Sequence, residues 1–399
     1  MKMTREYWFF IVLSGTGWLM SACRKPYSPP AINNDARFLV VEGVIAAGQD
    51  STIITLNRTI RISGINTANP ESGATVVVEG DQGVKYTLTE GGKGRYAAPP
   101  LNLDHTHKYH LLIGTADGRT YVSDYEPVKV TPPIDSVYYT INSANDGLKI
   151  FTNTHDPANN TRYYRWDYTE TYIYNSIVNS YYRYDNSQFF DTLKSVVRTP
   201  AQYIHTCYVT RPSTGVLLNS TAALSQDIIR GNQIIGIADT SEKILERYSI
   251  LVKQYALTND AYNFWYNIKR NTQQIGTIFD VQPAEVPGNI HCTSNPDEPV
   301  IGYVSVSTIS QKRIFIDRTE LPPWPYAVGT CNAYQICWPK GNNPDPDLLV
   351  GNVIPVGPIQ SGYCDLYKKF GYVVNVAYDF CADCRFHLHG VTQVPDFWK

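Results

Sequence analysis

The chain has 399 residues, a formal net charge of −2 at pH 7 and only 18% charged residues. Nucleic-acid binding requires clustered basic charge, so this near-neutral composition argues against that class of function. Aromatic residues make up 13% of the chain, and tyrosine alone occurs 30 times. Because aromatic and β-branched residues favour strands, and because a domain takes about 100–200 residues, we predict a mainly β protein of two or three domains.

The N-terminus has the features of an export signal. Two basic residues within the first five precede an uncharged run over residues 7–22. A membrane-spanning helix needs about 20 apolar residues. This run is shorter, contains glycine and ends in small residues, as cleavable signals do. The triplet ending at Cys23 resembles a bacterial lipobox, with Met20 where Leu, Val or Ile is usual. We predict a signal peptide over 1–22 and lipidation of Cys23, with an ordinary secretory signal as the alternative.

A first β domain is predicted over residues 37–131, after a proline-rich tether over 23–36. Strands are expected over 38–46 and 51–59. Turns at 81–83 and 117–118 each predict a hairpin, since their glycines supply the positive φ angles that tight turns need. Short strands at this spacing are typical of an immunoglobulin-like sandwich. A Thr-Pro-Pro sequence at 131–133 marks the boundary.

A second β-rich, sandwich-like domain is predicted over residues 132–319. Alternating, aromatic strands are expected over 161–174 and 248–258. One amphipathic helix is predicted near 260–275, because apolar residues recur there at helical spacing and Thr258 or Asn259 can cap its start. Its aromatic stripe is predicted to be core. The segments 300–309 and 312–318 predict a further hairpin.

A cysteine-rich C-terminal region is predicted over residues 320–399. Export places cysteines in an oxidising compartment, where disulfides are the default. Seven cysteines follow Cys23, so at least one stays free if all pairs are intramolecular, and the connectivity is left open. The disulfide candidates are Cys207, Cys292, Cys331, Cys337, Cys364, Cys381 and Cys384. The Cys381-x-x-Cys384 motif also fits zinc, but export favours pairing of its cysteines with each other or with Cys292, Cys331, Cys337 or Cys364.

The sequence matches the motifs of metal sites and hydrolases poorly. His105, His107 and His110 do not share one strand face, and the oxygen-rich segment 342–347 does not match a calcium loop. No G-x-S-x-G, H-E-x-x-H or glycine-rich phosphate motif occurs. Carboxylates that a hydrolase could pair are Asp156, Asp167, Glu170 and Glu285. The sequence therefore predicts no catalytic residues, no metal and no cofactor.

Two sets of side chains are candidates for recognition or modification. Exposed Tyr and Trp are favoured at contacts, being large, rigid and amphipathic, although they can equally pack a sandwich. The candidates for a binding face are Tyr163, Tyr164, Trp166, Tyr168, Tyr172, Tyr174, Tyr181 and Tyr182. Three short matches to an O-glycosylation signal place candidate sites at Ser51, Ser136 and Thr192.

Several stretches, in order along the chain, resemble a family of Bacteroidota lipoproteins, the domain of unknown function 4249. They include FLVVEGVI, TPPIDSVYY, TRYYRWDY, YSILVKQYALTNDAYNFW and CADCRFHLHGVTQVPDFW. The resemblance implies a lipid-anchored outer-membrane protein, with an N-terminal module similar to those on TonB-dependent receptors, and it supplies no catalytic residues. Arg24 and Lys25 follow Cys23, where surface-exported relatives often carry acids, so the periplasmic or surface orientation is left open.

The expected function is therefore binding, as an accessory of a TonB-dependent transporter or of its cargo. Two alternatives remain open: an envelope hydrolase acting on glycan or peptide, and a structural surface protein without a small ligand. Clustered carboxylates in a cleft would favour the hydrolase.

Overall fold

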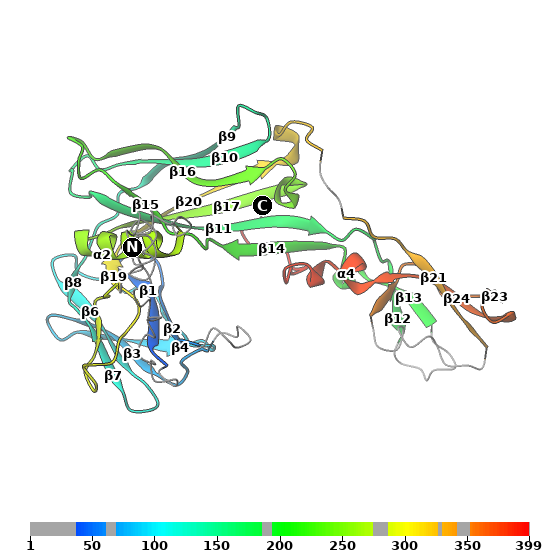
Figure 1. Ribbon diagram of the computed structural model, residues 1–399, viewed down its shortest axis with the longest axis horizontal. Helices are drawn as coiled ribbons and strands as arrows, with labels where there is room; N and C mark the ends of the chain where they lie inside the picture. The colour runs from blue at the N-terminus through cyan, green and yellow to red at the C-terminus, as the bar shows by residue number, and fades with distance from the viewer. Residues whose placement is uncertain are drawn as a thin grey trace, which may run out of the picture.

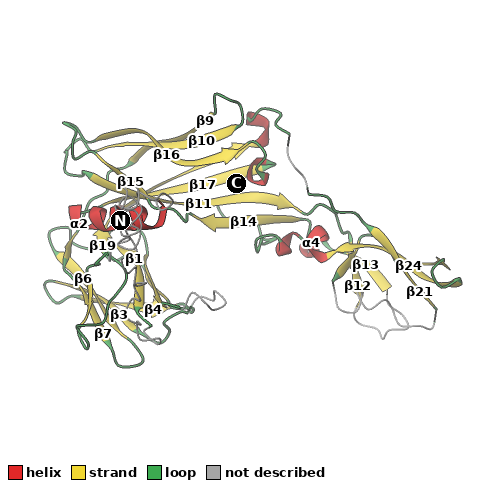
Figure 2. Ribbon diagram, viewed as in Figure 1, coloured by secondary structure: helices red, strands yellow, loops and turns green. Residues whose placement is uncertain are grey.

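The computed structural model describes residues 37–60, 69–185, 194–273, 286–325, 329–340 and 352–398. The predicted signal peptide, Cys23 and the tether lie outside these ranges. The molecule is elongated (Figure 1), and strands dominate it (Figure 2). Within the described ranges, α2 (Asn259–Gln273) is the one long helix. The mainly β prediction is confirmed.

The N-terminal part is a β-sandwich whose two layers join where β4 meets β5. The strand order is β18-β7-β6-β3-β4-β5-β2-β1-β19, with β8 beside β6. Alternate residues such as Leu39, Val41 and Val76 are buried in one shared core. The predicted hairpins β3–β4 and β6–β7 are confirmed. The strands are β1 (Leu39–Ala46), β2 (Thr52–Arg58), β3 (Thr75–Gly80), β4 (Lys85–Glu90), β5 (Arg95–Ala98), β6 (Lys108–Gly114), β7 (Thr120–Ser123), β8 (Glu126–Pro127), β18 (Ile290–Cys292) and β19 (Ser305–Ser307).

The predicted hairpin over 300–309 and 312–318 is wrong. Strand β19 runs parallel to β1, whereas β20 (Ile309–Asp317) pairs with β17 in another sheet. Val304 and Val306 are buried in the N-terminal core, which draws this segment back to it. Gly302 allows this segment to approach β1 closely, because any larger residue would place its Cβ 2.1 Å from the carbonyl oxygen of Val41. The predicted range 132–319 does not anticipate this return.

The central part is a second pair of packed sheets, as predicted for a sandwich-like region. One sheet has the order β16-β10-β9, and the other has the order β14-β11-β17-β20 with β15 beside β11. Leu148, Trp166 and Tyr248 lie in the core between them. The strands are β9 (Ile134–Ile141), β10 (Gly147–His155), β11 (Tyr163–Asn175), β14 (Thr206–Pro212), β15 (Leu217–Ser220), β16 (Ile228–Ala238) and β17 (Arg247–Ala256). Short 3-10 turns are η2 (Pro200–Gln202), η3 (Glu242–Ile244) and η4 (Arg318–Glu320).

Helix α2 lies at the junction of the two sandwiches (Figure 1). The backbone N–H of Ala261 donates to Thr258 Oγ1 at 3.2 Å, which is the predicted cap. Phe264 is buried with Tyr255 of the central sheet and Tyr303 of the N-terminal sandwich. The predicted helix is confirmed, and it contacts both sandwiches. Its predicted core stripe holds for Ala261 and Phe264, whereas Trp265 is only partly buried and faces the cleft described below.

A buried carboxylate, that of Glu126, links the N-terminal sandwich to the start of helix α2. Glu126 is buried and accepts hydrogen bonds from the Tyr303 hydroxyl, from Asn289 Nδ2 at 3.3 Å and from Thr258 Oγ1 at 3.4 Å. Burial raises the pKa of Glu126 above its ordinary value, although each donated hydrogen bond lowers it.

The C-terminal part forms a separate body at the far end of the molecule (Figure 1). Its sheet has the order β21-β24-β22, with β23 also beside β24, and the β12–β13 hairpin packs on it through Tyr184. Ile336, Trp338 and Val376 form its small core. The elements are β12 (Tyr182–Asp185), β13 (Lys194–Val197), β21 (Tyr334–Pro339), β22 (Val353–Pro355), β23 (Gln360–Cys364), β24 (Lys369–Tyr378), α4 (Asp379–Ala382) and η5 (Cys384–Phe386).

Three disulfides support this region: Cys207–Cys384, Cys331–Cys381 and Cys337–Cys364. The cysteines of the C-x-x-C motif do not pair with each other. Cys384 bonds to β14 of the central sheet, and Cys381 bonds to the segment before β21. Of the seven disulfide candidates, Cys292 does not pair and is the free thiol that the odd count requires: it is buried, because β18 places it in the N-terminal core, away from the other six.

We predict that Glu126→Gln changes the pH dependence of stability. Glu126 has a raised pKa in the folded state, so its stabilising contribution is complete below about pH 4.5 and is lost as the pH rises through that raised pKa. The free energy of unfolding of the variant, relative to wild type, should therefore increase from pH 4 to pH 7. Urea denaturation at several pH values measures it. Glu42→Gln, at an exposed glutamate of β1, is the control, and an equal pH trend in both variants contradicts the prediction.

We predict that removing Cys207–Cys384 costs more stability than removing Cys337–Cys364. The paired cysteines are 177 residues apart in the first disulfide and 27 in the second. Longer closed loops restrict the unfolded chain more, and losses of about 2–5 kcal/mol are typical. Urea denaturation of the two double Cys→Ser variants measures the difference. An equal or reversed order would show that native contacts, not loop closure, set the loss.

Candidate functional site

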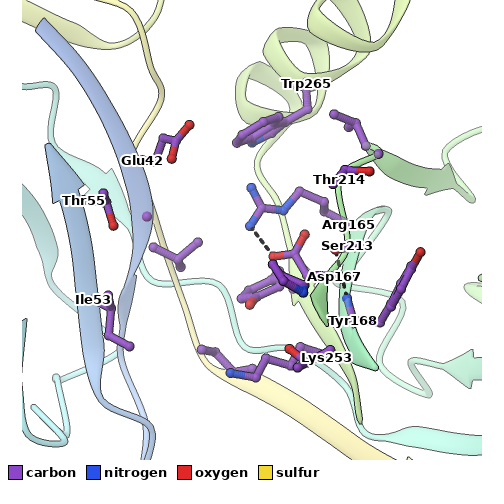
Figure 3. A pocket seen from close by; sticks show the side chains of 18 of the residues that line it. Glu42, Ile53, Thr55, Arg165, Asp167, Tyr168, Ser213, Thr214, Lys253 and Trp265 are labelled. Carbon is purple, nitrogen blue, oxygen red and sulfur yellow. Dashed lines mark hydrogen bonds and ion pairs between the residues drawn. The ribbon is translucent and has the colours of Figure 1, made fainter. Parts of the chain in front are cut away.

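A cleft of about 580 Å³ lies between the two sandwiches. Figure 3 shows its walls: Glu42, Ile53 and Thr55 from β1 and β2 face Arg165, Asp167 and Lys253 from β11 and β17. Trp265 of α2 closes one end, and the loop after β14 contributes Ser213 and Thr214. The volume falls within the ~300–1,000 Å³ of small-molecule sites.

The pleat of β11 sets which side chains reach the cleft. Successive strand residues point to opposite faces. Tyr164 and Trp166 point into the central core, so Arg165 and Asp167 point outward to the cleft. On the facing wall, Gly43 has a φ of +147°, and a Cβ there would lie 2.3 Å from the carbonyl oxygen of Ile53. The close pairing of β1 and β2 at this wall therefore requires glycine.

Arg165 is the most constrained charged group of the cleft. Only 8% of it is exposed. Its guanidinium carbon lies 4.5 Å from the ring centroid of Trp265 and 4.8 Å from that of Tyr255. Nη2 donates to Asp167 Oδ2 at 3.1 Å. Two aromatic faces and one carboxylate thus fix the guanidinium in a single orientation.

Two donors at this position have no acceptor among the described residues. They are Nε of Arg165 and the indole Nε1 of Trp265, both buried. A buried donor without an acceptor costs about 1–3 kcal/mol, and such groups are uncommon in folded proteins. Both side chains line the cleft.

The cleft is balanced in charge. Glu42 and Asp167 oppose Arg165 and Lys253. Asp167 and Lys253 are also cross-strand neighbours of β11 and β17. Burial raises the pKa of the Tyr255 hydroxyl well above its ordinary value, so this group stays neutral at physiological pH.

Three of the predicted binding-face residues lie in the central core, which corrects their assignment to an exposed face. Tyr164 and Trp166 have no exposed surface, and Tyr172 is 1% exposed. Their polar atoms are satisfied internally: the hydroxyl of Tyr164 donates to Asp227 at 2.7 Å, and the indole of Trp166 donates to Gln254 at 2.9 Å. Burial raises the pKa of Tyr164 and Tyr172 well above the ordinary value.

The other five lie in different places. Tyr163 packs on the helix through Tyr262, at 5.0 Å between ring centroids. Tyr168 borders the cleft, where its backbone N–H donates to Ser213. Tyr174 stacks on His387 at 3.8 Å, and Tyr182 is half-buried in β12. Tyr181 is 51% exposed. The predicted residues therefore do not share one surface.

The carboxylates weighed for a hydrolase lie apart. Asp156 accepts backbone N–H bonds from Ala158, Asn160 and Thr161, which stabilise a turn. Glu170 points to the core side of β11 and pairs with Lys243 at 2.6 Å. Asp167, three residues before it, points to the cleft, and Glu285 lies outside the described residues. Of the described members of this set, no two converge.

The remaining candidates are the histidines, the oxygen-rich segment and the three O-glycosylation positions. His107 pairs with Asp81 at 2.9 Å and His110 with Glu79 at 3.3 Å. Across the part of the chain that is described, no group of three or more His, Cys, Asp or Glu could hold a metal ion. The segment 342–347 and Thr192 lie outside that part. Ser51 is exposed at the rim of the cleft, and Ser136 is half-buried.

A second feature is an apolar hairpin tip, residues 363–370, formed by the end of β23, the turn and the start of β24. Leu366 is 78% exposed and Phe370 is 75% exposed, with Tyr363 and Tyr367 also exposed. Tyr363 and Phe370 are cross-strand partners with ring centroids 5.6 Å apart. Sequence reasoning missed this tip, although its Leu-Tyr-Lys-Lys-Phe run between two strands was the available signal. It also missed Arg165, Lys253 and Trp265 as a cluster, because they come from three separate elements.

Exposed apolar side chains are frequent along the last part of the sequence, which includes the tip and the segment that returns to the central sheet. Of the 24 exposed large apolar side chains in the described residues, 11 lie between positions 363 and 397. Among those same residues, the structure contains no helix with the length and apolarity to cross a membrane.

Comparisons with known proteins give a family but no activity. The model of a family described as a domain of unknown function (DUF4249) matches residues 24–313. No curated protein matches. A crystal structure of a Salmonella alpha-2-macroglobulin mutant is similar over 86% of this chain at 8% identity, with a TM-score of 0.17, and this chain spans 18% of that one. That likeness is too low to bear on fold or function.

We predict that Tyr164→Phe and Tyr181→Phe have different effects on stability. The first leaves buried Asp227 without the Tyr164 donor and should lower the free energy of unfolding by about 1–3 kcal/mol. The second alters an exposed ring and should change it by less than about 0.5 kcal/mol. Urea denaturation measures both. Equal effects would contradict the division of these tyrosines between core and surface.

Proposed function

We propose that this chain, which belongs to the family of the domain of unknown function DUF4249, is a lipid-anchored outer-membrane protein that binds a partner without covalent chemistry. The partner is a TonB-dependent transporter or the cargo of such a transporter. The host is a member of the Bacteroidota. The observation that carries the proposal is the apolar hairpin tip at the far end of an elongated molecule.

The N-terminal sequence supports the anchor. An uncharged run that ends in small residues precedes Cys23, and a proline-rich segment follows it. A diacylglycerol-modified Cys23 would attach the chain to a membrane, with about 0.8 kcal/mol for each buried methylene. The proline-rich segment would separate the first strand from the lipid surface.

The hairpin tip supports docking to a protein. Leu366 and Phe370 expose most of their surface to water, which is unfavourable unless a partner covers them. The disulfide Cys337–Cys364 ties the tip itself to β21, because Cys364 is the last residue of β23 before the turn, so the tip is presented with little conformational freedom to lose. Aromatic side chains held on a fixed element are typical of interface anchors.

The environment of the carboxylates supports binding rather than hydrolysis. Asp167 is paired with Arg165, and Glu170 is paired with Lys243. General acid–base catalysis needs two groups that converge on one reacting bond. Within the described residues, the candidates weighed for that role do not converge, so recognition is the activity that the geometry favours.

The test is an affinity pull-down of the native, tagged protein from detergent-solubilised outer membranes, with mass spectrometry of what it recovers. We expect one TonB-dependent transporter at near-stoichiometric yield. Leu366→Ser combined with Phe370→Ser should reduce that yield about tenfold or more, as removal of interface anchors commonly does. Leu224→Ser is the matched control, because Leu224 is 54% exposed on the central part.

Two results would count against the proposal. Recovery of the native protein alone would exclude a stable transporter complex. Recovery of the transporter at equal yield by the tip variant and by Leu224→Ser would exclude docking through the tip.

A further inference from the structure

We propose that the cleft between the two sandwiches binds a neutral oligosaccharide. This binding site is separate from the hairpin tip. The inference goes beyond the proposed function, because it assigns a ligand class to a surface that the docking proposal does not use.

The balance of charge selects a neutral ligand. The cleft carries two acidic side chains, Glu42 and Asp167, and two basic ones, Arg165 and Lys253. Asp167 already neutralises Arg165 at 3.1 Å. An anionic ligand would meet these carboxylates and a cationic ligand would meet the two bases, so neither gains a net attraction.

The chemistry of the lining selects a ligand rich in hydroxyl groups. Besides its four charged residues, the cleft is lined by five serine or threonine residues. Carboxylates only accept hydrogen bonds, whereas guanidinium and ammonium groups only donate them. A sugar hydroxyl does both, so neighbouring hydroxyls can bond to Asp167 and to Lys253 at once.

The unsatisfied donors provide the second observation. Nε of Arg165 and Nε1 of Trp265 are buried donors of the cleft without an acceptor among the described residues. Arg165 is fixed between Trp265 and Tyr255, so its donors are already oriented when a ligand arrives. Both nitrogens are covered, so adjacent sugar oxygens supply acceptors for this pair after a small shift of the Trp265 side chain.

An extended peptide that adds a strand fits the cleft less well. That mode of recognition relies on backbone pairing along a sheet edge, with apolar pockets for alternate side chains. At the cleft, β11 already pairs with β14, β15 and β17, and β1 already pairs with β2 and β19. These cleft walls therefore offer sheet faces, which present side chains, and not free backbone edges.

The experiment uses the full processed protein and a glycan array that holds both neutral and acidic oligosaccharides. The strongest neutral binder is then titrated by calorimetry. Trp265→Phe keeps an aromatic ring against Arg165 but removes the indole N–H, and should weaken binding about tenfold, the effect of one hydrogen bond. Lys253→Gln should weaken it by a similar factor.

The matched control is Tyr266→Phe, which alters the neighbouring, exposed residue of α2 and should leave affinity unchanged. Leu366→Ser should also leave it unchanged, which separates this site from the docking surface. The inference would be overturned if none of the neutral oligosaccharides on the array bound. Binding confined to acidic glycans or to peptides on a parallel peptide array, or equal affinity of Trp265→Phe and Tyr266→Phe, would overturn it as well.

Discussion

The pleat of strand β11 is the constraint on which the rest of the structure depends. Its residues Tyr164, Trp166 and Tyr172 are buried in the core between the central sheets, and its odd-numbered residues Arg165 and Asp167 face the cleft. A shift of one residue in its register would turn the charged Arg165 and Asp167 into the core and turn a tryptophan and a tyrosine out of it. Its pairing with β14, β15 and β17 prevents that shift. One strand thus stabilises the core and orients the cleft.

The junction between the sandwiches makes the cleft a fixed feature. The segment 286–307 returns from the central part to pair with β7 and β1, so the chain crosses the junction more than once. Helix α2 contacts both sides, and Glu126 is hydrogen-bonded by Tyr303, Asn289 and Thr258 from separate segments. Because these contacts are buried, relative motion of the two sandwiches would expose polar and apolar groups together. The walls that carry Glu42 and Arg165 are therefore held facing one another.

The C-terminal part is stabilised differently. Its core is small, and three disulfides supply constraints that hydrophobic burial alone would not. Cys207–Cys384 attaches the C-terminal segment to β14, and the ring of Trp398 then packs on Tyr208 and Phe315 of the central sheet. This arrangement allows the distal hairpin to expose Leu366 and Phe370 without weakening the core beneath it.

The sequence alone determined the local features whose physical cause is local. Alternation predicted β11 and β17, the turn glycines predicted the hairpins β3–β4 and β6–β7, and helical spacing with Thr258 as cap predicted α2. The odd cysteine count predicted a free thiol. Tertiary structure decided which cysteine that is, why β19 leaves β20 to join β1, and which aromatic residues of β11 are core. Tertiary structure also creates the cleft, because Arg165, Lys253 and Trp265 meet only when two sandwiches and a helix pack together. Long-range packing of this kind leaves no periodic signal in the sequence, since it depends on which faces bury the most apolar surface.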